Sequence, residues 1–130
     1  MPDADPVAPS EALVQGLART LGAEVIETHI SWVLLAGELA FKVKKPVRLA
    51  FVDYSTLESR RHFCEEELRL NHRLAPTLYL GVARITGSPQ APVLDGEGPA
   101  IDYAVRMRRF SQHALFSERI AAQPAAPYFR

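Results

Sequence analysis

All three lysines of the chain lie in one short apolar stretch, at positions 42, 44 and 45. Every other basic residue is an arginine, so this stretch is where a compact ammonium group has been placed. Alternation along an extended strand puts Ala40, Lys42 and Lys44 on one face and the apolar residues 39, 41 and 43 on the other. We expect the apolar face to pack in the core and the other face to present a cation, although Lys44 and Lys45 also fit a solvated strand edge.

A long helix is expected to begin at residues 55–58. These residues read Ser-Thr-Leu-Glu, the pattern of a capping box in which Ser55 is the N-cap and Glu58 reaches back to it. The helix should end near residue 74, because the residue before Pro76 disfavours helical geometry. The apolar residues that are spaced to form one inward stripe are Phe63, Leu70 and Leu74.

Glu67 falls on this expected stripe, four residues after Phe63 and three before Leu70. Three successive glutamates at 65–67 are typical of a solvated face, but a carboxylate on an inward stripe is costly unless it is paired. A lysine from the sheet would pair it. We therefore predict an ion pair between Lys42 and Glu67, with Glu66 as the alternative partner.

The rest of the chain predicts an α+β fold. Ser10 is the expected N-cap of a first helix that runs to about Leu21 and is closed by Gly22. Strands are expected over residues 24–27, 31–36, 39–45, 78–85 and 100–107, with a short one around 92–94 and a tight turn at residues 37–38. Residues 47–54 are left as an ambiguous connection. The prediction is an antiparallel sheet of about five strands, packed by one long helix and an N-terminal helix.

Composition limits the class of protein. Fifteen basic and fifteen acidic residues balance, which argues against binding to nucleic acid or to an anionic membrane. The single cysteine excludes an internal disulfide and fits a reducing compartment. No apolar run approaches the roughly 20 residues that cross a bilayer, and the first residues are acidic, unlike a secretory signal. We therefore expect a cytoplasmic protein.

The predicted order of elements is helix, two strands, lysine strand, glutamate helix and two strands, the arrangement of the amino-terminal lobe of a kinase. In kinases, a strand lysine contacts the phosphates of ATP and is held by a helix glutamate. Four runs carry a closer resemblance: ETHISWV (27–33), AFKVKKPV (40–47), FCEEELRLN (63–71) and YAVRMRRF (103–110). They resemble the aminoglycoside-phosphotransferase-like family of bacterial proteins over about residues 10–120. Members of this family are often joined to a carboxy-terminal P-loop ATPase domain.

This resemblance implies an ATP site and a role for each of its residues. Lys42 would contact the phosphates and Glu67 would hold it. Ala40 would leave room for the adenine, Met107 would sit where the strand meets the hinge, and the Arg108 backbone would face the adenine. The turn from Thr28 to Ser31 would take the place of the glycine-rich loop.

The resemblance also places the catalytic aspartate, the asparagine and the metal-binding aspartate in a carboxy-terminal lobe, and no such segment follows in this sequence. We therefore expect a truncated member with no catalytic residues in this chain and no means to hold Mg²⁺ alone. Its expected partners are a nucleotide and a kinase lobe or P-loop ATPase domain supplied by a longer chain. The expected organisation is a disordered segment over 1–9, the lobe over 10–110, and a linker helix with a disordered tail over 111–130.

Other functions also fit parts of the sequence. A non-catalytic interaction module that keeps the lobe fold is the main alternative. A nucleic-acid binder would use Arg106, Arg108, Arg109 and Phe110, but alternation puts the first two on a solvated face and the net charge is zero. For a metal, only His62 and Glu66 share a helix face, with no third ligand in view, and Cys64 is expected to face the core.

Overall fold

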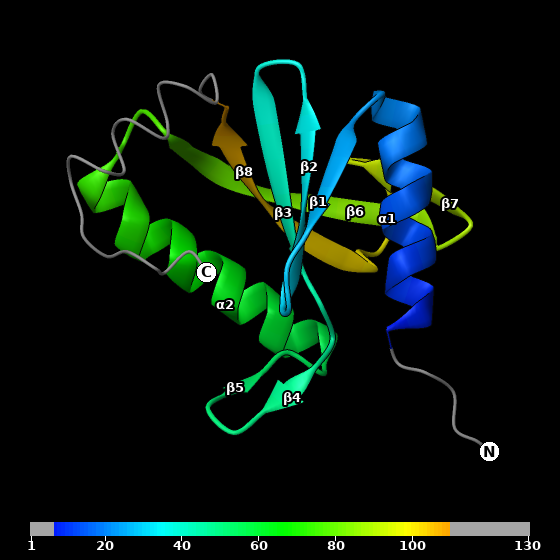
Figure 1. Ribbon diagram of the computed structural model, residues 1–130, viewed down its shortest axis with the longest axis horizontal. Coiled ribbons are helices and arrows are strands. Elements are labelled where there is room, and N and C mark those ends of the chain that lie inside the picture. The colour runs from blue at the N-terminus through cyan, green and yellow to red at the C-terminus, as the bar shows by residue number, and fades with distance from the viewer. Residues whose placement is uncertain (1–6, 110–130) are drawn as a thin grey trace.

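The computed structural model describes residues 7–109, and Figure 1 shows their arrangement. The elements in chain order are α1 (Ala8–Leu21), β1 (Glu24–Glu27), β2 (Ser31–Ala36), β3 (Leu39–Lys44), β4 (Arg48–Leu49), β5 (Val52–Asp53), α2 (Leu57–Leu74), β6 (Tyr79–Ser88), β7 (Ala91–Leu94) and β8 (Asp102–Arg108). The predicted linker helix and tail over 111–130, Phe110, and residues 1–6 of the predicted disordered start lie outside the described residues.

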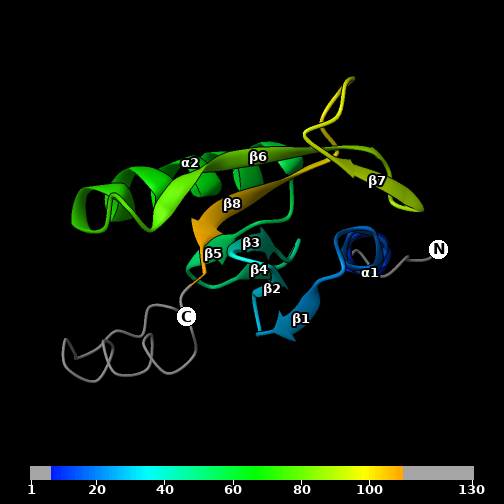
Figure 2. The ribbon, with the colours of Figure 1, turned by 90° about the horizontal axis from the view of Figure 1, so that it is seen from above.

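Six of the strands form one antiparallel sheet in the order β1-β2-β3-β8-β6-β7, and Figure 2 shows how it curls. The α+β class and the antiparallel sheet are confirmed, and the sixth strand, β7, is the short one expected around residues 92–94. The connection over 47–54, which the sequence left ambiguous, forms a separate two-stranded hairpin of β4 and β5. The predicted tight turn between β2 and β3 is also present, with Gly37 at a φ of 63° that favours glycine.

α1 covers one face of the sheet. Its buried residues Leu13, Val14 and Leu17 pack into a core with residues of β2, β3, β6 and β8. On β3, these core residues are Phe41 and Val43, the odd-numbered face that the sequence predicted to be apolar. Burial of each such side chain contributes about 1.5–3 kcal/mol, so this layer is the main source of stability in the sheet.

α2 packs on the opposite face, mainly against β8 and β6, and the two helices flank strands β1 to β3 (Figure 1). Its predicted inward stripe was right for Phe63, which is half-buried, and for Glu67, but wrong for Leu70 and Leu74, which are 51% and 85% exposed. The buried residues of α2 are Arg60 and Cys64, so the inward face is rotated from the expected one. The cause is that polar side chains on this face find charged partners in the sheet, which apolar periodicity does not reveal.

Both predicted N-caps were wrong by one or more positions. α1 begins at Ala8 with Val7 as its N-cap, because Pro9 in the first turn starts the helix earlier, and Ser10 is buried inside that turn. α2 is capped by Thr56, which accepts from the Ser59 amide, while the Ser59 hydroxyl accepts in return from the Thr56 amide. The ends were predicted correctly, with Gly22 in a left-handed conformation after α1 and Ala75 after Leu74.

Neither helix among the described residues is long and apolar enough to cross a membrane.

Candidate functional site

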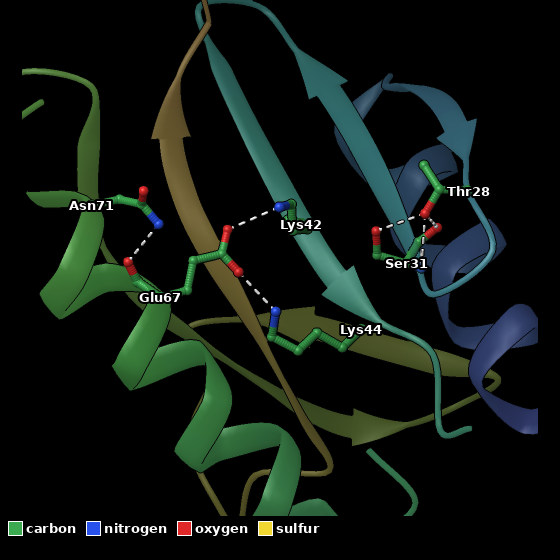
Figure 3. Close-up of polar contacts among 6 residues, drawn as sticks. All are labelled: Thr28, Ser31, Lys42, Lys44, Glu67 and Asn71. Atoms are coloured by element: carbon green, nitrogen blue, oxygen red, sulfur yellow. Dashed lines mark hydrogen bonds and ion pairs between the residues drawn. The ribbon is translucent and has the colours of Figure 1, made fainter. Parts of the chain in front are cut away.

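The predicted ion pair between strand β3 and helix α2 is present. Lys42 Nζ lies 2.8 Å from Glu67 Oε2, and the two side chains are 17% and 15% exposed (Figure 3). β3 places Lys42 on the face that α2 covers, opposite to Phe41 and Val43, as the alternation of the strand predicted. Asn71, one turn further along α2, donates from Nδ2 to the Glu67 carbonyl oxygen.

A second lysine joins this pair, which the sequence analysis did not predict. Lys44 Nζ lies 2.7 Å from Glu67 Oε1, so each carboxylate oxygen of Glu67 holds one ammonium group. The sequence also allows Lys44 to be a solvated edge residue, but its side chain is only 6% exposed. The signal was present in the sequence, since residues 42 and 44 share a face of the strand.

Electrostatics keep Lys44 and Glu67 charged. Burial alone would raise the pKa of Glu67, but the attraction and hydrogen bonds of Lys42 and Lys44 outweigh it and hold the pKa below its ordinary value. Burial likewise opposes the charged form of Lys44, and Glu67 outweighs it, so the pKa of Lys44 is raised. With two ammonium groups around one carboxylate, the cluster has a positive charge in excess.

The neighbouring candidates are placed elsewhere. Glu66, the alternative partner, is paired with Arg69 at 2.7 Å on the outer side of α2. Lys45 pairs with Glu27 at 2.6 Å, and its ammonium lies 5.3 Å from the centroid of the Trp32 ring. The lysine partner in this structure is therefore Glu67 and not Glu66.

Ala40, predicted to leave room for the adenine, and Met107, predicted to lie where the strand meets the hinge, are neighbours on adjacent strands. Ala40 of β3 is the register partner of Met107 of β8. Ala40 lies two residues before Lys42, a distance of about 7 Å along the strand. The Arg108 amide donates to the Leu78 carbonyl oxygen at 2.8 Å, so this N–H is engaged within the fold. The sheet face thus runs from a small apolar end at Ala40 and Met107 to the cationic cluster.

The predicted phosphate turn lies at the other end of this face. Ser31 is the register partner of Lys44, which brings the turn between β1 and β2 next to the lysines. Thr28 Oγ1 accepts from the Ser31 amide at 3.0 Å and from the Ile30 amide at 3.3 Å, and it lies 3.0 Å from Ser31 Oγ (Figure 3). Two amides of the turn are therefore already satisfied by a side chain, unlike the free amides of an anion-binding nest.

A second buried ion pair was missed in the sequence. Arg60 of α2 donates from Nε to Asp102 Oδ1 at 3.1 Å and from Nη1 to the Tyr54 carbonyl oxygen at 2.9 Å. Burial raises the pKa of Asp102 despite the attraction of Arg60. Both residues line a pocket of about 220 Å³ that contains none of the predicted ATP-site residues. An aspartate at the start of a strand, where this residue type is depleted, was the available signal.

The other candidate chemistries gain nothing from the structure. Arg106 shares the face of Phe41, with its guanidinium 5.6 Å from that ring, and it pairs with Asp95, so it is not on a free basic surface. No group of three metal-ligating side chains occurs among the described residues. Cys64 faces the core as expected, and burial raises the pKa of its thiol to about 12.

Curated relatives of this chain occur in mycobacteria. Uncharacterized proteins of Mycobacterium bovis and of two strains of Mycobacterium tuberculosis are each 38% identical to it over 99 residues. The match covers 76% of this chain but 18% of each relative, so the chain spans less than a fifth of their length. No family model and no solved structure matches the chain significantly.

Proposed function

We propose that this chain is the nucleotide-binding lobe of an aminoglycoside-phosphotransferase-like protein, and that it holds ATP against the sheet face under α2. The observation that carries the proposal is the contact of 2.8 Å between Lys42 of β3 and the carboxylate of Glu67 on α2. The small residue Ala40 lies two positions before Lys42 on the same face of β3. Kinase-like phosphotransferases require such a strand lysine and helix glutamate to position the phosphates of ATP.

The residues on this face fit a nucleoside triphosphate in their chemistry and order. The excess positive charge of Lys42, Lys44 and Glu67 suits the phosphates, and the apolar pair Ala40 and Met107 suits a purine. The Thr28 and Ser31 hydroxyls stand at the phosphate end. When bound, ATP supplies the phosphoryl group for transfer. The role of this chain is to bind and orient it, and cytoplasmic location is part of the same proposal.

The remaining machinery belongs to the proposal as well. The resemblance assigns Mg²⁺ binding and the orientation of the acceptor to a second lobe. Proteins of the length of the mycobacterial relatives have room for such a lobe and for a P-loop ATPase domain, since the matched segment is 18% of each of them. The phosphate acceptor would be recognised there and not on this sheet.

The test compares ATP binding by Lys42→Ala and Lys45→Ala. At ten times Kd, ATP should stabilise the wild type by about 1.4 kcal/mol, or about 5 °C in Tm. Lys42→Ala should abolish this shift, because it removes the phosphate contact. Lys45→Ala is the matched change: Lys45 lies one residue past the end of β3 and pairs with Glu27, so this variant should keep the shift. Equal shifts in the two variants would reject the site.

A second candidate, an interaction module, is favoured by one observation. Leu70 and Leu74 lie one turn apart near the C-terminal end of α2 and are 51% and 85% exposed. Apolar side chains placed in this way suit contact with another part of a longer protein. If this is the function, ATP should leave the Tm of the wild type unchanged, and Leu70→Gln with Leu74→Gln should weaken binding of the chain to the remainder of a mycobacterial relative.

A further inference from the structure

Glu67 is bound by two lysines with different surroundings. Lys44 is 6% exposed, and its ammonium lies 2.7 Å from Glu67 Oε1 and 5.1 Å from the centroid of the buried Tyr54 ring. Lys42, bound to the other oxygen at 2.8 Å, is 17% exposed. The Lys44 contact is therefore the enclosed one, and the Lys42 contact is the more accessible one.

This difference matters when an anion arrives. In a site with one lysine, the ammonium must be shared between the helix carboxylate and the incoming phosphate, because the carboxylate has no other partner. In this site, one charge on Lys44 already balances the charge on Glu67. The charge on Lys42 is then available to a ligand, and α2 stays attached to β3 through Lys44 when Lys42 moves.

We propose that Lys44 is a positioning residue, which holds the Glu67 carboxylate on the sheet while the Lys42 ammonium turns to a phosphate of the bound nucleotide. The inference rests on the proposed function, since it gives Lys44 a role in the same site. Lys44 itself does not touch the ligand. Its effect is to leave one net positive charge at the position of Lys42.

The first test needs no nucleotide. The carboxyl carbon of Glu67 is followed by NMR as a function of pH in Lys42→Met and in the double variant Lys42→Met/Lys44→Met. If Lys44 holds Glu67 alone, the pKa of Glu67 in Lys42→Met stays below the ordinary value of 4.5. In the double variant it rises above 4.5, because burial remains and both cations are gone. An equal rise in both variants would overturn the proposed role of Lys44.

The second test measures the Kd of ATP by calorimetry. Lys44→Met leaves Lys42 and Glu67 as a neutral pair, so ATP should bind about tenfold more weakly or worse. Adding Glu67→Gln to Lys44→Met restores the single positive charge on Lys42, and the affinity should recover most of the loss. Lys44→Arg, which keeps the charge, should bind more tightly than Lys44→Met. Lys45→Met should bind as the wild type does.

The outcomes separate the two proposals. If Lys42→Met loses ATP binding but Lys44→Met keeps it, the role of Lys44 is overturned and the proposed function stands. If Lys44→Met binds ATP weakly and adding Glu67→Gln does not recover the affinity, Lys44 serves only the packing of α2. That result also overturns the inference. If the wild type binds no ATP, the proposed function fails, and the carboxyl titration still decides whether Lys44 holds Glu67.

Discussion

The protonation of Glu67 is set by two opposing effects, burial and the two lysines that bind its oxygens. The lysines prevail, so the pKa of the folded state is below the ordinary value of 4.5. A carboxyl group with a depressed pKa stabilises the fold above its unfolded pKa, and this contribution is lost as the pH falls through the folded pKa. The contribution of the ion cluster should therefore be full at neutral pH, begin to fall below about pH 4.5 and be lost as the pH passes through the lower folded pKa.

Glu67→Gln should show this dependence. At pH 7 the variant should lose about 2 kcal/mol of unfolding free energy, because two buried or half-buried ammonium groups lose their charged partner. The difference from wild type should shrink as the pH falls below 4.5, where the wild-type carboxylate also becomes neutral. Urea unfolding at a series of pH values measures it.

Glu66→Gln is the matched control, since it removes the neighbouring carboxylate from an exposed pair with Arg69. It should change the unfolding free energy little at any pH. A loss for Glu67→Gln that stays constant from pH 3 to 7 would contradict the ionic origin of the effect.

At the scale of elements, α2 carries the glutamate, so its first turn fixes the direction from which Glu67 approaches β3. The turn is closed by Thr56 and Ser59, while the predicted cap Ser55 binds Asp53 through its amide and its hydroxyl. Thr56→Ala should cost about 1 kcal/mol of unfolding free energy. The shift of the urea unfolding midpoint, at an unchanged m-value, measures this loss. Ser55→Ala is the control and should lose clearly less unfolding free energy. A larger loss for Ser55→Ala than for Thr56→Ala would instead place the N-cap at Ser55, as the sequence predicted.

The two helices also differ in how deeply their leucines are buried. Leu74 of α2 is 85% exposed, and Leu17 of α1 is fully buried in the core under the sheet. Leu17→Ala should cost about 2–5 kcal/mol because it leaves a cavity, whereas Leu74→Ala should stay within about 0.5 kcal/mol of wild type. Thermal unfolding of both variants measures the difference. A large loss for Leu74→Ala would restore the predicted inward stripe.

Sequence patterns predicted the elements better than the faces. Strand alternation found β3 correctly, because Phe41 and Val43 are apolar and Lys42 and Lys44 are not. Helical periodicity failed on α2, since its inward face is built from Arg60, Cys64 and Glu67, two of which are charged. Charged pairs across 25 or 42 positions, such as Lys42 with Glu67 and Arg60 with Asp102, depend on tertiary packing. Only the first was predicted, because its carboxylate lay on a stripe where an unpaired charge would be costly.

At the scale of the whole molecule, the curled sheet separates two kinds of packing. The face under α1 is apolar and contributes most of the stability, and the face under α2 carries two buried ion pairs. A buried ion pair is weak evidence for stability, because desolvation offsets much of its attraction. We propose that the Lys42, Lys44 and Glu67 cluster is kept on this face for nucleotide binding, whereas the Arg60–Asp102 pair joins α2 to β8 away from that site.

The most direct measurement is an NMR titration of the isotopically labelled chain with ATP, following the backbone amides. We predict shifts along one track of the sheet face, at residues 28–31 in the β1–β2 turn, at 40–44 on β3 and at Met107 on β8. These shifts should be lost in Lys42→Ala and kept in Lys45→Ala. Shifts gathered instead around Arg60 and Asp102 at the 220 Å³ pocket, or no shifts at saturating ATP, would contradict it.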